Sequence, residues 1–180
     1  GRVIIGGFDS NQLWRYENGT WVSVANIPNL VDVTQIATDS QGHIYLQGAS
    51  SAGNAIYTNV SGSFQSIGQP SGINAESSGM VIDQNDVLHV AFINQSKTFK
   101  YASNVWTAES DVNANADNIK ALSIDIKGNM FASAGSDNNI YEKTPTGSWT
   151  VINPVVSSDT LNRIRLANGS LLKITTNSSF

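Results

Sequence analysis

The chain has 180 residues, a net charge of −4 and only 13 % charged residues, so polar uncharged side chains fill much of its surface. This length suits one domain with a single core. The ten basic residues are dispersed from Arg2 to Lys173. Because nucleic acid and anionic membranes require a basic cluster, we expect neither as a partner.

The chain has no cysteine, which excludes disulfides and thiolate metal sites. No apolar run approaches the roughly 18 residues of a membrane-spanning helix. Asn-x-Ser/Thr tripeptides, which can accept N-linked glycans, favour an extracellular or secreted protein. They begin at Asn18, Asn59, Asn94, Asn168 and Asn177.

The first predicted elements are three short strands. The chain opens with "GRVIIGG", continues with "NQLWRY" and, after the Asn-Gly turn at 18–19, with "TWVSV". A fourth strand lies in the apolar run around Ile36, just before Asp39. We call this strand A and the three strands before it B, C and D in chain order. The order A, B, C, D repeats from there on, and no segment has a helical period.

Two aromatic positions define the repeat. The second aromatic residue recurs at intervals of 43, 42 and 43 residues, and the first at 43, 42 and 42. The second aromatic is Trp21, Phe64, Trp106 and Trp149, and the first is Trp14, Tyr57, Phe99 and Tyr141. We interpret these aromatics as wedge residues that fill the space between neighbouring sheets.

An aspartate follows strand A in successive copies, at Asp39, Asp83 and Asp125, and begins an Asp-x-x-Gly step. The second copy departs from it and reads Asp83-Gln84-Asn85-Asp86. Aspartate accepts backbone hydrogen bonds in tight turns and glycine adopts positive φ, so the step predicts the turn between strands A and B. A calcium loop would need several oxygen ligands in one loop, which makes that alternative the weaker one.

Four short strands in a unit of 42 to 44 residues predict an all-β fold, a β-propeller of four-stranded blades. We expect one propeller domain over residues 1–180, with repeats at about 1–34, 35–78, 79–120 and 121–162 and closing strands in 163–180. Apolar residues on both faces of each blade would be covered by the neighbouring blades.

The repeat resembles those of tectonin and tachylectin-type lectin propellers, and also NHL and two-component-regulator propeller repeats. The likeness lies in Asp-x-x-Gly, the apolar-aromatic pair and Gly-Ser-Trp, as in "NNIYEKTPTGSWTVI" at 138–152. The lectin resemblance implies carbohydrate binding in pockets between or above the blades. No copy matches a sugar-site motif closely enough to transfer ligand residues.

The strand count leaves the closure of the ring open. The chain starts at a strand B and ends with a strand A and a strand B in 163–175. We expect four blades, with the last strand A completing the first blade and a surplus strand that pairs with another chain in a homo-oligomer by strand exchange. A fragment of a five-bladed ring, which would lack about 35 residues, is the alternative.

Candidate ligand-binding residues are acids on one predicted rim, formed by the D-to-A connections and the B-to-C loops. The D-to-A acids are Asp32, Glu76, Asp117 and Asp159, and the B-to-C acids are Asp9 and Asp137. Carboxylates and amides there could accept sugar hydroxyls, a cation or basic side chains, whereas solvated turn residues are the plainer interpretation. We expect function to lie in residues that differ between the copies.

The two histidines do not form a catalytic pair. His89 takes the place of Tyr45 and Phe131, so we expect a wedge residue with a satisfied polar edge, and His43 is expected to be exposed. No nucleophile elbow, arginine cluster or metal-ligand set is evident, so we expect no catalytic residues, cofactor or metal. The sequence predicts a non-catalytic binding propeller, with a glycan or protein ligand. A structural assembly module and a hydrolase or lactonase are the alternatives.

Overall fold

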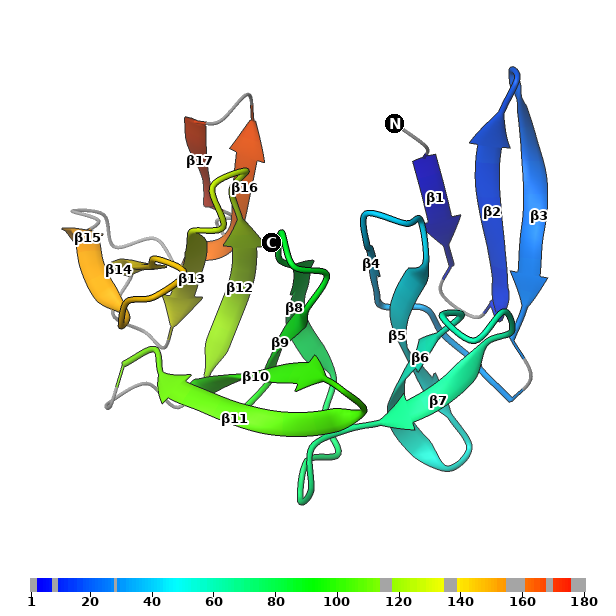
Figure 1. Cartoon of the computed structure of the whole chain (residues 1–180), viewed down its shortest axis with the longest axis horizontal. Helices are drawn as coiled ribbons and strands as arrows, with labels where there is room; N and C mark the ends of the chain where they lie inside the picture. Colours follow the sequence, from blue (N-terminus) through cyan, green and yellow to red (C-terminus); the bar gives the residue numbers. More distant parts are fainter. Residues whose placement is uncertain are drawn as a thin grey trace, which may run out of the picture. The chain divides into compact units, whose positions relative to one another are not determined.

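A computed structural model describes residues 3–7, 10–27, 29–113, 118–134, 139–154, 161–167 and 170–175, with side chains up to residue 152. All regular elements among these residues are β-strands (Figure 1). None of the described segments is a helix that could cross a bilayer. The chain divides into two compact units, Gly1–Glu76 and Ser77–Phe180, which we describe separately.

The first unit holds two antiparallel sheets. One is three-stranded, in the order β1(Val3–Gly6), β2(Gln12–Glu17), β3(Thr20–Asn26). The other is four-stranded, in the order β4(Gln35–Thr38), β5(Ile44–Ser50), β6(Gly53–Thr58), β7(Gln65–Gly68). Within each sheet every strand pairs with the next one along the chain, as short hairpin connections require.

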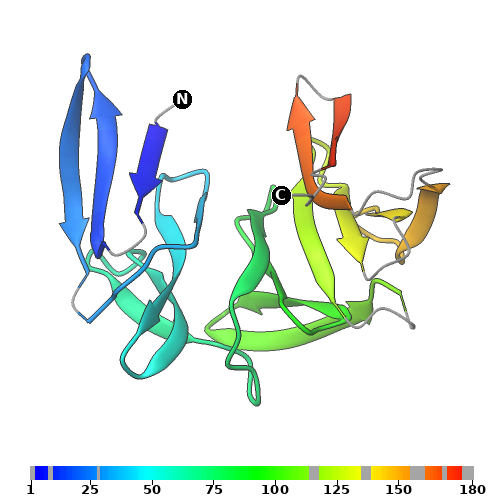
Figure 2. The same cartoon turned by 180° about the vertical axis from the view of Figure 1, so that it is seen from behind.

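The second unit holds two four-stranded antiparallel sheets and a strand pair (Figure 2). The sheets are β8(Ser77–Ile82), β9(Leu88–Phe92), β10(Lys97–Ala102), β11(Val105–Asp111) and β12(Ile119–Ile124), β13(Met130–Ala134), β14(Asn139–Lys143), β15(Thr150–Pro154). The pair is β16(Leu161–Ala167) with β17(Ser170–Thr175). The inner strand β12 lies beside both β8 and β16.

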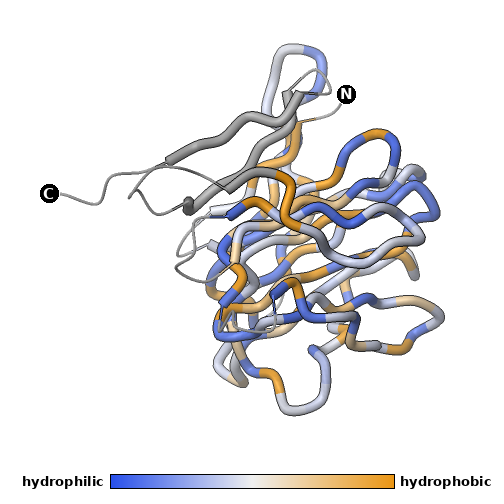
Figure 3. The backbone as a smooth tube through the Cα atoms, turned by 90° about the vertical axis from the view of Figure 1, so that its left-hand side faces the viewer, coloured by the Kyte–Doolittle hydropathy of each residue, from blue (hydrophilic) through white to orange (hydrophobic). Residues whose placement is uncertain are grey.

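These sheets confirm the all-β propeller fold with blades of about 43 residues. Strands A, B, C and D occur where the repeat predicts them, and hydrophobic and hydrophilic stretches alternate along the chain (Figure 3). The predicted closing pairing of the last strand A with the first blade, the single domain and the oligomer stay predictions. In the second unit β16 pairs with β17.

The Asp-x-x-Gly prediction is confirmed at the A-to-B turns. In each turn the Oδ1 atom of the aspartate accepts two backbone N–H groups: Asp39 from Gln41 and His43, Asp83 from Asn85 and Val87, and Asp125 from Lys127 and Asn129. Gly42 and Gly128 have φ of 86° and 84°, and Asp86 has φ of 60° in the second turn. An aspartate at positive φ is strained where glycine is not.

A β-bulge recurs between strands C and D of the blades. The register shifts at Leu13/Trp14, Ile56/Tyr57, Lys97/Phe99 and Ile140/Tyr141. A bulge inserts one residue and redirects its side chain. The repeat places Val24, Ile67, Glu109 and Ile152 there, three residues after the second aromatic.

The aromatic repeat has two roles instead of one. Tyr141 and Phe99 are buried, as a wedge residue should be. Trp21 is 47 % exposed and contacts Tyr16 with tilted rings, whose centroids are 5.1 Å apart. Trp106 contacts Tyr101 in the same way, at 5.0 Å, because each Trp lies directly opposite its tyrosine in the C-to-D hairpin.

Candidate functional site

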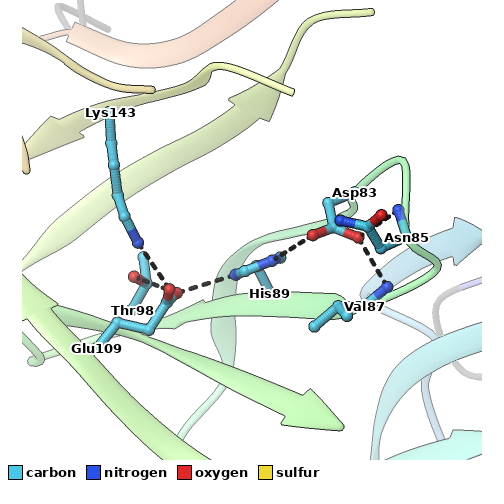
Figure 4. Close-up of polar contacts among 7 residues, drawn as sticks. All are labelled: Asp83, Asn85, Val87, His89, Thr98, Glu109 and Lys143. Atoms are coloured by element: carbon cyan, nitrogen blue, oxygen red, sulfur yellow. Dashed lines mark hydrogen bonds and ion pairs between the residues drawn. The ribbon is translucent and has the colours of Figure 1, made fainter. Parts of the chain in front are cut away.

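The second unit contains a pocket of about 210 Å³ between sheets β8–β11 and β12–β15. It lies at the end of the sheets that carries the A-to-B and C-to-D turns. Its polar lining comes from both sheets (Figure 4). The residues that matter for its chemistry are Asp83, Asn85, His89, Lys100, Glu109 and Lys143.

Three polar side chains take positions that are apolar in the other copies of the repeat: His89 and Glu109, which line this pocket, and the buried Thr98. The other copies have an aromatic or aliphatic residue in the slot of His89, and aliphatic residues in the slots of Thr98 and Glu109. The corresponding residues are Tyr45 and Phe131; Leu13, Ile56 and Ile140; and Val24, Ile67 and Ile152. A polar cluster therefore occupies one blade at positions where the other copies have apolar residues. These apolar residues are buried in the slots of His89 and Thr98, whereas in the slot of Glu109 they are partly buried or, at Ile152, exposed.

Glu109 is the centre of this cluster. Its Oε1 atom accepts a hydrogen bond from Lys143 Nζ at 2.7 Å, which joins the two sheets. Its Oε2 atom accepts from Thr98 Oγ1 and from His89 Nδ1, both at 2.9 Å (Figure 4). The Glu109 side chain is only 10 % exposed.

These contacts keep Glu109 ionised despite its burial. Burial raises the pKa of a carboxyl group, but the hydrogen bonds and positive charge from His89 and Lys143 outweigh that effect. Together they lower the pKa of Glu109 from 4.5 to about 2. Glu109 is therefore a fixed carboxylate at neutral pH and does not serve as a general acid.

His89 lies between two carboxylates. Because a carboxylate only accepts, His89 Nδ1 donates to Glu109, and its Nε2 atom faces Asp83 Oδ2 at 3.4 Å. The ring is 6 % exposed, which confirms the prediction of a buried residue with its polar edge satisfied. His43, predicted to be exposed, has a half-buried side chain instead because its Nδ1 atom bonds Asp39 Oδ2 at 2.8 Å.

The turn at Asp83 explains why a carboxylate oxygen reaches His89. In the other two turns the Oδ2 atom of the aspartate bonds the side chain four residues on, His43 for Asp39 and Asn129 for Asp125. Val87 occupies that place after Asp83 and has no hydrogen-bonding side chain. The Oδ2 atom of Asp83 therefore faces His89 and the pocket.

The predicted rim lies at the opposite end of the strands from this pocket. Asp32 is half-buried and Glu76 is exposed, both in D-to-A connections as expected. The other four candidates, Asp117, Asp159, Asp9 and Asp137, lie outside the described residues. Ligand binding at the rim stays a prediction.

Glu109, Thr98 and Lys143 were missed as site residues by sequence reasoning. Two of them could have been found, because alignment of the copies shows Glu109 and Thr98 as polar residues at positions that are apolar in the other copies. Their contact with Lys143 depends on the packing of two sheets and is not encoded by spacing. Among the described residues, no group of three or more His, Cys, Asp or Glu side chains could hold a metal ion.

Comparison with solved structures places this fold among propeller proteins. Virginiamycin B lyase from Staphylococcus aureus matches with a TM-score of 0.75 and 14 % identity, over 97 % of this chain and 59 % of the lyase. A chain of the nidogen/laminin complex matches with a TM-score of 0.72 and 14 % identity, over 97 % and 70 %. Aldose sugar dehydrogenase from Streptomyces coelicolor matches with a TM-score of 0.66 and 15 % identity, over 97 % and 71 %.

At these identities the likeness concerns the fold alone. The chain spans about six tenths of the lyase, and the three proteins differ in what they do. Neither a protein-family model nor a curated protein matches the sequence. The chain is a propeller-repeat protein, and its function has to be argued from the pocket.

Proposed function

We propose that this protein is a non-catalytic binding propeller that takes a small polar ligand, best a carbohydrate, in the pocket between sheets β8–β11 and β12–β15. The observation that carries the proposal is that His89, Thr98 and Glu109 stand in one blade where the other copies have apolar residues. These side chains are paired with one another, and a buried polar network is often no more stabilising than apolar packing at the same positions. A binding role explains why this blade has polar side chains there.

The lining of the pocket fits a polyhydroxylated ligand. Asn85, Lys100 and Lys143 offer N–H donors, and the amide oxygen of Asn85 can accept a hydroxyl. Apolar side chains of Val87, Ile124 and Met130 line the same pocket and can cover the C–H faces of a sugar ring. A volume of about 210 Å³ suits one sugar unit and not an extended chain.

Calorimetric titration with D-glucose, D-galactose, D-mannose and N-acetyl-D-glucosamine tests this function. We expect at least one sugar to bind with a dissociation constant below about 1 mM, and Asn85→Ala to weaken it several-fold. Gln41→Ala is the matched control, because Gln41 occupies the same position in the A-to-B turn of β4 and β5. Absence of binding for these four sugars and for D-glucuronate would refute the proposal. We also propose an extracellular location.

Catalysis is the second candidate, favoured by the Asp83–His89–Glu109 chain. A histidine held by a carboxylate is a common general base. One solved neighbour is a catalytically inactive variant of virginiamycin B lyase in which a histidine is replaced by alanine, with quinupristin bound. Turnover of a lactone or cyclic depsipeptide panel that disappears in His89→Phe and persists in His43→Phe would establish an enzyme, whereas inactivity would favour the binding role.

A further inference from the structure

The acceptor atoms of the pocket are largely engaged within the protein. Glu109 accepts one hydrogen bond at Oε1 and two at Oε2. Asp83 accepts two backbone N–H groups at Oδ1 and faces His89 at Oδ2. Both carboxylates therefore have few lone pairs to offer a ligand.

The donors of the pocket are not used up in the same way. Lys100 is exposed, lines the pocket, and lies directly across from His89 in the β9–β10 pair. Among the described residues its ammonium group is in no ion pair, since the cations that are paired there are Arg15, Lys97, Lys143 and the two histidines. Lys143 gives one N–H to Glu109 and can direct its other two elsewhere.

The charges lead to the same conclusion. Lys143 and Glu109 compensate each other at 2.7 Å. The charge of Asp83 is partly compensated by two backbone N–H groups and by the imidazole of His89. Among the described residues Lys100 has no such close partner, so a group that contacts its ammonium gains most if it is an anionic acceptor.

We propose that the ligand of this pocket is a small hydroxylated carboxylate of the sugar-acid class, with its carboxylate on Lys100 and its hydroxyls on Asn85 and Lys143. This inference rests on the proposed binding function and narrows it. A carboxylate fits the spare ammonium donor of Lys100. Hydroxyl oxygens can accept from Lys143, and hydroxyls can both accept from and donate to the amide of Asn85. Lys100 thereby determines which sugars the pocket prefers.

The first unit has a cation in the same position of the repeat, but that cation is already paired with a carboxylate. We therefore expect one such ligand site per chain. Arg15 occupies the slot of Lys100 in its own sheet, since Arg15 lies across from Ile4 as Lys100 lies across from His89. Glu17 pairs with Arg15 Nη2 at 2.8 Å. Arg15 is therefore already compensated by its own hairpin.

Calorimetric titration of the whole chain with D-glucuronate and with D-glucose, at low ionic strength, tests the inference. The wild type should bind one glucuronate at least about tenfold more tightly than glucose, because a charge-assisted contact is added. Lys100→Met should remove that preference while residual glucose binding persists. Lys100→Arg should keep the preference, and Arg15→Gln should leave it unchanged.

Each outcome separates the two proposals. Equal affinity for the two sugars, or a preference that survives in Lys100→Met, would overturn the sugar-acid inference and leave the binding function standing. Loss of the preference in Arg15→Gln would move the site to the first unit and overturn both assignments. If neither glucuronate nor any neutral sugar binds a wild-type chain with an intact thermal unfolding transition, both proposals fail.

Discussion

Two pockets at equivalent places in the repeat have different chemistry. The pocket of the first unit, about 450 Å³, is lined by Ile4, Arg15 and the turn 38–42. The pocket of the second unit, about 210 Å³, has His89 and Lys100 in the corresponding slots and adds Glu109. Each has a cation on strand C facing an A-to-B turn of the next sheet.

The difference lies in where the carboxylate is held. Glu17 is about one-third exposed and pairs with Arg15 within one hairpin. Glu109 is buried, is held by three donors, and joins two sheets through Lys143. The same backbone therefore supports a solvated surface ion pair in one place and a buried polar network in the other. Only substitutions in the buried network should lower the free energy of unfolding strongly.

The largest expected effect is the loss of stability when the buried carboxylate of Glu109 is removed. Glu109→Ala leaves Lys143, His89 and Thr98 without their common acceptor, so we expect about 3 kcal/mol of destabilisation in urea unfolding. Glu17→Ala, the matched change in the first unit, should cost about 0.5 kcal/mol or less because it removes an exposed ion pair. Equal losses in the two variants would contradict the contrast between the pockets.

The next largest expected effect is a loss of unfolding free energy at acid pH. The pKa of Glu109 is lowered to about 2, so its stabilisation is complete above its unfolded value of 4.5 and is lost as pH falls through about 2. After allowance for solvent screening we expect this loss to be about 2 kcal/mol between pH 5 and pH 2.

Urea unfolding at pH 7, 5, 3 and 2 measures this loss. Subtracting the profile of Glu109→Gln from that of the wild type isolates the contribution of the one carboxyl. A flat difference would show that the network does not hold the carboxylate as described.

The smallest effect concerns the turn beside the second pocket. Asp86 has φ of 60° where the first and third A-to-B turns have glycine. Asp86→Gly should raise the free energy of unfolding by up to about 1 kcal/mol, because glycine adopts this conformation without strain. Gly42→Ala should act in the opposite direction by a similar amount, as thermal unfolding would show; destabilisation by Asp86→Gly would argue that the aspartate has a role of its own.

The fold could be predicted because it depends on repeated local features. Asp39, Asp83 and Asp125 each close a turn through hydrogen bonds to residues two and four positions on, which sequence spacing reveals. Tyr141 is buried as the repeat implies. Trp21 and Trp106 were less predictable, since their stacking on a tyrosine depends on the register of one hairpin.

The candidate site could be predicted only in part. His89 was correctly expected to be buried with its polar edge satisfied. Its partner Glu109 lies twenty residues further along the chain and Lys143 another thirty-four, in the next sheet. Contacts over such separations are set by how strands pair and sheets pack, for which a single sequence carries no direct signal.

The sequence by itself determined the length of the repeat, the order of its strands and the chemistry of its turns, because these arise from interactions between near neighbours. It also marked His89, Thr98 and Glu109 as departures from the repeat. Only the tertiary structure decided that these departures meet Lys143 in one pocket, since the packing of one sheet on the next brings the ammonium to the buried carboxylate.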